Sequence, residues 1–434
     1  MRGTVLLAAL LVLAPAARGA PSTATVSGAG GINDIATDVT VATVTGHVYF
    51  SGYVNAGAGN SDAWIGKYTY DLVLVASSVV AGSLARDDRW YGIAVGADGN
   101  VYVAGNLNHL NDNDSGVVWV AKFSPALVLL ASGTYNNGCC FQDSANDIGL
   151  DSSGNVFVAG TVRTGGGGHE QWVGKYSSQL AFLGSANSAS GGNRGLQGLA
   201  VLGSGLSFGA GSGDGSGRLI RFDSIPAKTH EAAEGAGASD AVHDPAGTVF
   251  FVNGVPETGQ SDNILVSKRS ALDLSLISSR TYNGSEGLSD SGAGGALGPD
   301  GELFVVGHTS VSAGRDVWGL RLDSNLVVLG SVTFNGSAGS DDAASRVALG
   351  PGGRVFLAGN VVTASQGQDM WLAVYPGTAA PAFAGYSSVS TASLIVSWTG
   401  PSVFWEVEAS SSPLPNANSG NRAVISTASS AALE

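Results

Sequence analysis

The most regular hydrophobic pattern in the chain is a short apolar segment that begins at a glycine turn and ends in a second glycine. Clear copies are GHVYFSG at residues 46–52, GNVYVAG at 99–105, GNVFVAG at 154–160 and two that end at Gly307 and Gly359, while weaker copies end at Gly211 and Gly254. Short runs of β-branched and aromatic residues between turn residues predict β-strands. The seven closing glycines recur about every 51 residues, a spacing typical of propeller blades.

Three other segments recur in step with the first. One usually starts with tryptophan, as in WIGKY at 64–68, WVAKF at 119–123, WVGKY at 172–176 and the copies at 318–322 and 371–375, with degenerate copies at 218–222 and 264–268. Another closes the unit at 127–136, 274–283 and 326–335, and a short one precedes the glycine turn at 92–95, 147–150 and 346–349. Each repeat therefore supplies four strands in meander order, called A to D, which make one propeller blade.

The two ends of the repeat region predict how the ring closes. The last repeat stops after Tyr375 without a D strand, whereas residues 23–30, before the first A strand, resemble the D segment at 331–336. An N-terminal strand that completes the last blade removes an open sheet edge. We therefore predict an all-β fold with seven four-stranded blades. Residues 194–237 depart most from the repeat, and a six-bladed ring is the alternative if this fourth unit is not a blade.

The repeat units resemble the bacterial β-propeller repeats of the SBBP type, with their alternation of GNVYVAG and WVAKY segments. The resemblance covers about residues 22–376. It implies a propeller fold and an extracytoplasmic setting, without a settled activity.

The amino-acid composition and net charge limit the classes of partner that the protein can favour. Gly accounts for 65 of 434 residues, and only 12% of residues are charged, as expected for many strands and tight turns. The net charge of −14 repels phosphate backbones and anionic lipid surfaces, which excludes nucleic acid as a favoured partner. We expect a monomer.

The N-terminus has the layout of a secretory signal. Arg2 precedes an apolar run at 5–13 and a small-residue stretch that ends near Gly19, so we predict a signal peptide at 1–19, with an uncleaved anchor as the alternative. No later apolar run is long enough to predict a transmembrane segment. We therefore expect a secreted or cell-surface protein.

The chain has two cysteines, Cys139 and Cys140, which are adjacent in sequence. They could form a disulfide that closes a strained ring between neighbouring residues, or they could remain two thiols.

The C-terminal part has a different composition. We predict the propeller at 20–376, a linker at 377–387 and a partial β-sandwich at 388–434. Residues 391–399, with Trp398, and residues 404–410 resemble the opening strands of a fibronectin type III sandwich. That sandwich needs roughly 90–100 residues, so the segment is too short to complete it.

Two recurring residue types have a structural interpretation. The aromatic residues of strands B and C recur once per blade, and we expect them to fill the core between blades. A cation recurs three residues after the tryptophan position and either lines the channel or makes structural pairs, which we favour. These cations are Lys67, Lys122, Lys175, Arg221 and Arg321.

Acidic and histidine residues are the candidate ligand-binding groups. An aspartate recurs just before strand A and could form a ring at the channel mouth, although Asp at such a turn commonly accepts backbone N–H bonds. The candidate binding residues are Asp34, Asp88, Asp143, Asp290, Asp342, His109, His169 and His308. Asp112 and Asp114, in the longest B-to-C loop, could bind Ca²⁺ but lack the spacing of an EF-hand. We expect no other cofactor.

No motif in the chain predicts catalysis: there is no nucleophile elbow, phosphate-binding loop or zinc helix. We therefore favour a recognition or adhesion scaffold that binds a glycan or a protein through loops on one propeller face. An enzyme that acts on extracellular polysaccharide through the acidic ring, or a structural spacer that binds nothing, are the alternatives.

Overall fold

The computed structural model describes residues 21–376, except for gaps at 29–32, 56, 58–59, 83–85, 111–114, 138–142, 164–167, 189–194, 214, 257–261, 285, 313, 337–340 and 363–366. Beyond residue 376 it describes the backbone of five strands. The predicted signal peptide, Asp112, Asp114, Cys139 and Cys140 lie outside the described residues. No helix in the described part of the chain is long and apolar enough to cross a membrane.

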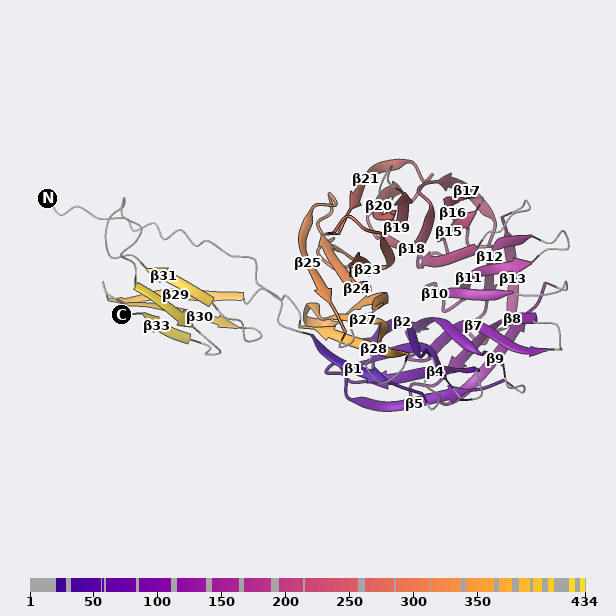
Figure 1. The fold of residues 1–434 in the computed structure, drawn as a ribbon, viewed down its shortest axis with the longest axis horizontal. Coiled ribbons are helices and arrows are strands. Elements are labelled where there is room, and N and C mark those ends of the chain that lie inside the picture. Colours follow the sequence, from indigo (N-terminus) through magenta and orange to yellow (C-terminus); the bar gives the residue numbers. More distant parts are fainter. Residues whose placement is uncertain are drawn as a thin grey trace. The chain divides into compact units, whose positions relative to one another are not determined.

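Seven four-stranded antiparallel sheets form a ring, each with its A strand near the centre and its D strand outside (Figure 1). Blades one to three consist of β2 (Ile35–Ala42), β3 (His47–Asn55), β4 (Ser61–Tyr68) and β5 (Leu74–Val80); β6 (Arg89–Val95), β7 (Val101–Leu110), β8 (Ser115–Phe123) and β9 (Leu129–Tyr135); and β10 (Ser144–Leu150), β11 (Val156–Arg163), β12 (His169–Tyr176) and β13 (Phe182–Asn187). Blades four and five consist of β14 (Gly195–Val201), β15 (Ser207–Gly213), β16 (Ser216–Phe222) and β17 (Lys228–Ala233); and β18 (Gly237–Asp244), β19 (Thr248–Pro256), β20 (Asp262–Ser270) and β21 (Leu276–Tyr282). Blade six consists of β22 (Asp290–Leu297), β23 (Leu303–Val311), β24 (Gly314–Leu322) and β25 (Val328–Phe334). Blade seven consists of β26 (Ala343–Leu349), the 3₁₀ turn η1 (Pro351–Gly353), β27 (Val355–Val362), β28 (Gln368–Tyr375) and β1 (Ser22–Val26).

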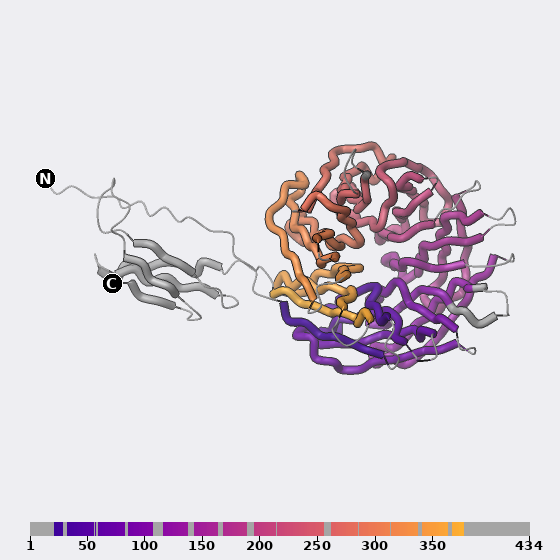
Figure 2. Tube along the Cα trace, in the orientation of Figure 1, coloured from indigo at the N-terminus to yellow at the C-terminus, as the bar shows by residue number. Residues whose placement is uncertain are grey.

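The ring closes through the N-terminal strand, as predicted. Strand β1 pairs with β28 in antiparallel register from Ser22 opposite Val374 to Val26 opposite Met370. Figure 2 shows this indigo strand beside the yellow end of the propeller. Blade four is a regular four-stranded sheet, so the seven-blade prediction is confirmed and the six-blade alternative is excluded.

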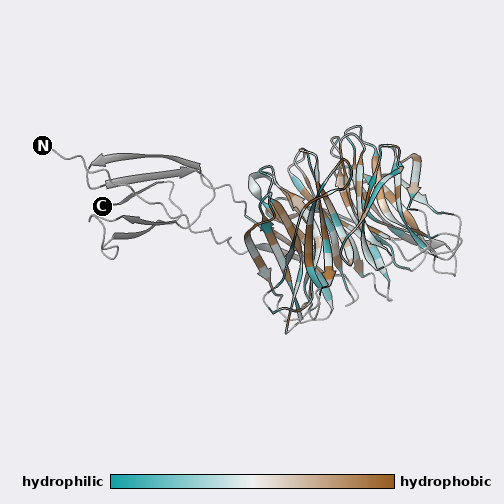
Figure 3. Ribbon diagram, turned by 90° about the horizontal axis from the view of Figure 1, so that it is seen from above, coloured by the Kyte–Doolittle hydropathy of each residue, from teal (hydrophilic) through white to brown (hydrophobic). Residues whose placement is uncertain are grey.

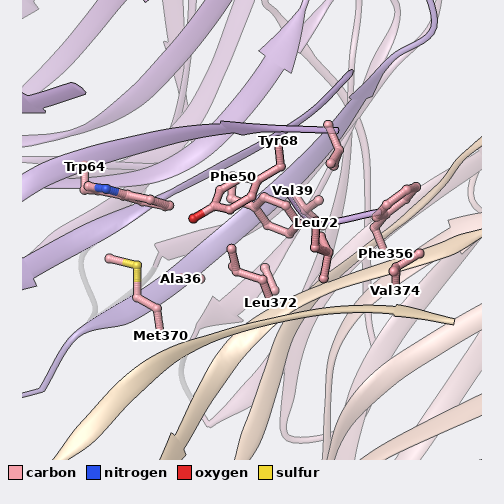
Figure 4. Packing of buried hydrophobic residues seen from close by; sticks show 12 residues of the cluster. Ala36, Val39, Phe50, Trp64, Tyr68, Leu72, Phe356, Met370, Leu372 and Val374 are labelled. Atoms are coloured by element: carbon pink, nitrogen blue, oxygen red, sulfur yellow. The ribbon is translucent and has the colours of Figure 1, made fainter. Parts of the chain in front are cut away.

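The hydrophobic core lies between neighbouring blades. Where blade seven meets blade one, Phe50, Trp64 and Tyr68 pack with Met370 and Leu372 (Figure 4). The recurring tryptophans are buried, with 3% of Trp64 and 1% of Trp371 exposed, which confirms that they are core residues. Apolar residues run along the propeller strands in Figure 3, as expected for sheets covered on both faces.

Four of the five recurring cations of strand C join their blade to the next one. Lys122 donates from Nζ to the carbonyl oxygen of Ser178 at 3.0 Å, in the C-to-D turn of the following blade. Lys67, Lys175 and Arg221 donate to the carbonyls of Pro125, Ser224 and Ala271 in the same way. Arg321 instead pairs with Glu302 at 2.6 Å. These groups make structural pairs, mostly with carbonyl oxygens.

The C-terminal segment contains five strands. They are β29 (Ala382–Ser390), β30 (Ser393–Thr399), β31 (Trp405–Ala409), β32 (Asn421–Ile425) and β33 (Ser430–Leu433). Strands β29, β30 and β33 form one sheet, and β31 pairs with β32. Strand β29 begins inside the stretch predicted as a linker, while β30 and β31 fall where sandwich strands are predicted. The resemblance to a fibronectin type III module stays a prediction.

Candidate functional site in the central channel

A β-bulge in every A strand marks the same position in all seven blades. The register shift lies between residues 36 and 38 in β2 and recurs at the matching place in β6, β10, β14, β18, β22 and β26. Bulges redirect side chains. The residue after the bulge alternates from blade to blade in the order Asp38, Gly92, Asp147, Gly198, Asp240, Gly294 and Arg346. We call Asp38, Asp147 and Asp240 the channel carboxylates.

Each channel carboxylate joins its own blade to the next. Asp38 accepts hydrogen bonds from the backbone N–H of Val39 at 2.7 Å and of Ile93, in blade two, at 2.8 Å. Asp147 accepts from Ile148 and Leu199, and Asp240 accepts from Ala241 and Gly295, all at 2.7–2.8 Å. Each carboxylate oxygen thus has one backbone partner and retains capacity for a further hydrogen bond.

The alternating glycines allow the A strands to approach one another closely. A Cβ atom on Gly92 would lie 2.9 Å from the Cα of Asp147, and one on Gly198 would lie 2.5 Å from the Cα of Asp240. A Cβ atom on Gly294 would lie 3.0 Å from the Cα of Arg346. Because these neighbours are backbone atoms, glycine is required at each position.

A seven-membered ring cannot alternate two residue types without a break, and Arg346 stands at that break. Its Nη1 donates to the carbonyl oxygens of Ala293 at 2.6 Å and Ser345 at 3.1 Å. Its Nη2 donates to the carbonyl oxygen of Gln197 at 2.9 Å. Since Gln197 lies in blade four and Arg346 in blade seven, the guanidinium joins distant parts of the ring across the channel.

The four charged groups shift one another's pKa values. Burial raises the pKa of Asp38 to about 7, against the attraction of Arg346, which lowers it. Burial also raises the pKa of Asp147 and Asp240, again opposed by Arg346. For Arg346 itself burial lowers the pKa, but the three carboxylates outweigh burial and raise it. The carboxylates therefore retain an uncompensated cost of ionisation.

A cavity of about 320 Å³ lies beside these groups. The charged part of its lining is the three channel carboxylates and Arg346, and the rest comes from the A strands: Leu199, Ala200, Ala241, Val242, His243, Gly295, Leu297 and Val347. Most of these residues follow the bulge position, so the cavity extends from the charged ring toward the A-to-B turns. Among the described side chains, the Nδ1 atom of His243 is buried without a hydrogen-bond partner.

The five aspartates singled out by the sequence occupy a different place. We call Asp34, Asp88, Asp143, Asp290 and Asp342 the loop carboxylates. All five are buried, with at most 3% exposed. Asp143 accepts from the backbone N–H of Asn137, after strand D of blade two, at 2.9 Å and of Arg163, in strand B of blade three, at 2.8 Å. Asp34, Asp290 and Asp342 repeat this pair of bonds, and Asp88 accepts from Gly82.

The loop carboxylates therefore have the structural role that sequence analysis offered as the alternative to ligand binding: each fastens the preceding blade to its own. Burial raises the pKa of Asp34, Asp143 and Asp342, although their backbone hydrogen bonds oppose the rise. Ligand binding by these residues stays a prediction.

Two of the three candidate histidines lie near loop carboxylates. Burial raises the pKa of Asp143, and the nearby His169 is one of the groups that oppose this rise. The pKa of His308 is lowered by burial and by Arg315, while Asp290 opposes this shift. His109 lies near the end of β7. Within the described residues, no three Asp, Glu, His or Cys side chains are placed to hold a metal ion, and the predicted Ca²⁺ ligands Asp112 and Asp114 lie outside that part of the chain.

Comparison with known proteins gives the fold and nothing finer. The chain matches no protein-family model and no curated protein sequence. A protein of unknown function from Dyadobacter fermentans is similar in structure, with 9% sequence identity over 82% of this chain and 100% of that one and a TM-score of 0.51. Sqt1 from Chaetomium thermophilum matches with 12% identity over 87% and 93% of the two chains and a TM-score of 0.47. The Dos1 propeller matches with 11% identity over 79% and 77% and a TM-score of 0.47.

Proposed function

We propose that this protein is a binding protein, and that its ligand site is the cavity in the central channel. The observation that carries the proposal is the coincidence of an open volume of about 320 Å³ with four charged groups from separate blades. Ligand pockets typically combine apolar walls with a few convergent polar groups, and propeller A strands bring such groups together around one axis.

The channel suits binding better than the loop carboxylates do. Each of the four loop carboxylates Asp34, Asp143, Asp290 and Asp342 uses both oxygens to hold backbone N–H groups of two blades. A ligand there would have to share acceptors that the fold already needs. The channel carboxylates also hold two backbone groups each, but they border an open volume that a ligand can enter.

Two features of the sequence support a binding role outside the cytoplasm. The signal layout at 1–19 supports a secreted or cell-surface location, and the absence of a predicted catalytic motif supports recognition without turnover. A glycan or protein bound through the face loops would extend the same recognition role.

The proposal can be tested by a thermal-shift and calorimetric screen of small polar compounds and cell-envelope saccharides against the full chain. We expect a saturable ligand that raises the melting temperature and that is lost in His243→Trp, which fills the cavity from its lining. His230→Trp makes the same replacement on the exposed outer strand β17 and should still bind. A screen without any saturable ligand, or equal binding by both variants, would refute a channel site.

A further inference from the structure

We propose, building on the channel site above, that the cavity selects a small organic cation, namely a primary ammonium group on a short aliphatic chain. The juxtaposition behind this assignment is a charged ring with an excess of carboxylates beside apolar walls. Three features of the cavity favour such a ligand: the charge balance of the ring, the engagement of Arg346 and the chemistry of the walls.

The charge balance favours a cation. Three channel carboxylates face one guanidinium, so the fully ionised ring has two more negative than positive charges. The carboxylates are 5–7% exposed, and charges in such surroundings interact more strongly than charges in water. A cation in the cavity would offset the excess, whereas an anion would add to it.

The engagement of Arg346 also disfavours an anion. Its guanidinium already donates three hydrogen bonds, to the carbonyl oxygens of Ala293, Ser345 and Gln197. Three of its five N–H groups are thus held in bonds that join blades four, six and seven, which leaves an anion two donors on this one side chain. By contrast, each carboxylate oxygen of Asp38, Asp147 and Asp240 has accepted a single backbone hydrogen bond. A primary ammonium brings three N–H donors and no acceptor, which matches the remaining capacity.

The walls determine what the ammonium is attached to. Leu199, Val242, Leu297 and Val347 line the cavity together with Ala200 and Ala241. These side chains offer no hydrogen bonds, so they favour the methylene groups of an aliphatic chain over a hydroxylated one. His243 is the remaining polar side chain of the lining.

The charge requirement can be isolated with three four-carbon ligands: n-butylammonium, 1-butanol and butyrate. Calorimetric titration of the full chain at pH 8 should show n-butylammonium binding at least roughly tenfold more tightly than the other two, a difference that corresponds to one favourable interaction. Tighter binding of butyrate would show that Arg346 governs the site and would overturn the proposal. Equal binding of 1-butanol would show that the walls alone bind, and would overturn it too.

The same titration has a pH signature that needs no variant. The charged and titratable groups around the cavity are Asp38, Asp147, Asp240, Arg346 and His243. Because burial raises the pKa of Asp38 to about 7, protons must leave the carboxyl groups when a cation binds. We therefore expect the affinity for n-butylammonium to fall as the pH is lowered from 8 to 6, and net proton release in buffers of different ionisation enthalpy. Affinity that is independent of pH would contradict the assignment.

Two pairs of variants separate the site from the general negative charge of the protein. Asp240→Asn should weaken n-butylammonium binding by roughly tenfold or more, whereas Asp300→Asn removes the same charge from an exposed turn and should have no effect. His243→Arg would place a tethered cation at the cavity and should abolish binding, whereas His243→Gln should retain it. Equal effects within either pair would overturn the assignment, and melting curves establish that each variant is folded.

The outcome also distinguishes the class of ligand from the site itself. If a neutral or anionic compound from the wider screen binds and is lost in His243→Trp, the channel site stands and the ammonium assignment fails. If no compound binds there at all, both fail.

Discussion

The loop carboxylates and the channel carboxylates are the same residue type in similar bonds, yet they differ in what surrounds them. In both sets an aspartate joins adjacent blades through backbone N–H groups, as Asp143 and Asp147 do from the same A-strand region of blade three. Asp143 uses both carboxylate oxygens to join blades two and three. Asp147 borders the channel cavity, and Asp38, Asp240 and Arg346 act on it electrostatically.

The two sets of carboxylates also differ in how they repeat along the chain. The loop carboxylates occur at the matching position in five of the seven blades, and Asp34, Asp143, Asp290 and Asp342 hold the same pair of backbone N–H groups. The channel carboxylates occur in alternate blades. A side chain in the blade between them would be too close, because a Cβ atom on Gly92 would lie 2.9 Å from the Cα of Asp147 and one on Gly198 would lie 2.5 Å from the Cα of Asp240. The repeated set thus joins neighbouring blades, whereas the alternating set lines the channel cavity.

The largest effect we expect is from Arg346→Met. This change leaves three carbonyl groups without their donor and removes the positive charge that faces three buried carboxylates. Breaking a buried charge arrangement by removing one partner costs about 3–5 kcal/mol. Urea unfolding at pH 8 measures this loss.

The loss in Arg346→Met should shrink when the pH is lowered to 5, because protonated channel carboxyls no longer need a cation. Arg280→Met removes an exposed arginine that makes one long hydrogen bond, to Leu326, and should cost about 1 kcal/mol or less. A loss that is the same for both arginines would refute the role assigned to Arg346.

The next effect is from Asp342→Ala, which tests a loop carboxylate. Its removal leaves the backbone N–H groups of Gly336 and Val362 without their acceptor. An unsatisfied buried donor costs about 1–3 kcal/mol, so we expect a loss of about 2–4 kcal/mol. The neighbouring Asp341 is exposed, and its Oδ1 lies 4.0 Å from the Nε of Arg315. Asp341→Ala should therefore cost about 0.5 kcal/mol or less. If Asp342→Ala and Asp341→Ala lower the free energy of unfolding in urea by similar amounts, Asp342 does not have the role of joining neighbouring blades.

A third prediction uses pH to distinguish the channel set. The pKa of Asp38 is raised from 3.8 to about 7, so between these values the folded protein holds a proton that the unfolded chain has released. Protonated Asp38 therefore stabilises the folded wild-type protein at low pH. This contribution to the free energy of unfolding is lost as the pH rises through that window, by up to about 1.4 kcal/mol per pH unit. Asp38→Ala lacks this dependence. The stability deficit of Asp38→Ala relative to wild type should accordingly shrink from pH 4 to pH 7, and a constant deficit would contradict the raised pKa.

The fold could be predicted from the sequence because its signals are local and repeated. The turn before Val101 and the apolar segment that ends at Gly105 recur in blade after blade, and the missing final D strand is matched by residues 23–30. Even blade four, which lacks the Gly-Asn turn and the tryptophan, keeps all four strands.

The channel site could not be predicted in the same way. Asp38, Asp147 and Asp240 are two blades apart along the chain, and the search for residues shared by every blade passes over them. Their side chains reach the channel through a β-bulge, which shifts the register and is not visible in the hydrophobic pattern. The available signal is the alternation of Asp and Gly at matching positions of the A strands, with Arg346 as its single exception.

The smallest effect tests this alternation directly. In Gly92→Ala the new Cβ atom would lie 2.9 Å from the Cα of Asp147 and 3.0 Å from the backbone nitrogen of Ile148. Strands β6 and β10 must then move apart, which we expect to cost about 1–2 kcal/mol, as other overpacking changes do. Gly330, in the outer strand β25, has no atom within 4 Å of its Cβ position, so Gly330→Ala should be neutral or stabilise the protein by up to about 1 kcal/mol. If Gly92→Ala is equally harmless, the ring has room for a side chain in every blade, and the alternation reflects something other than the spacing of the A strands.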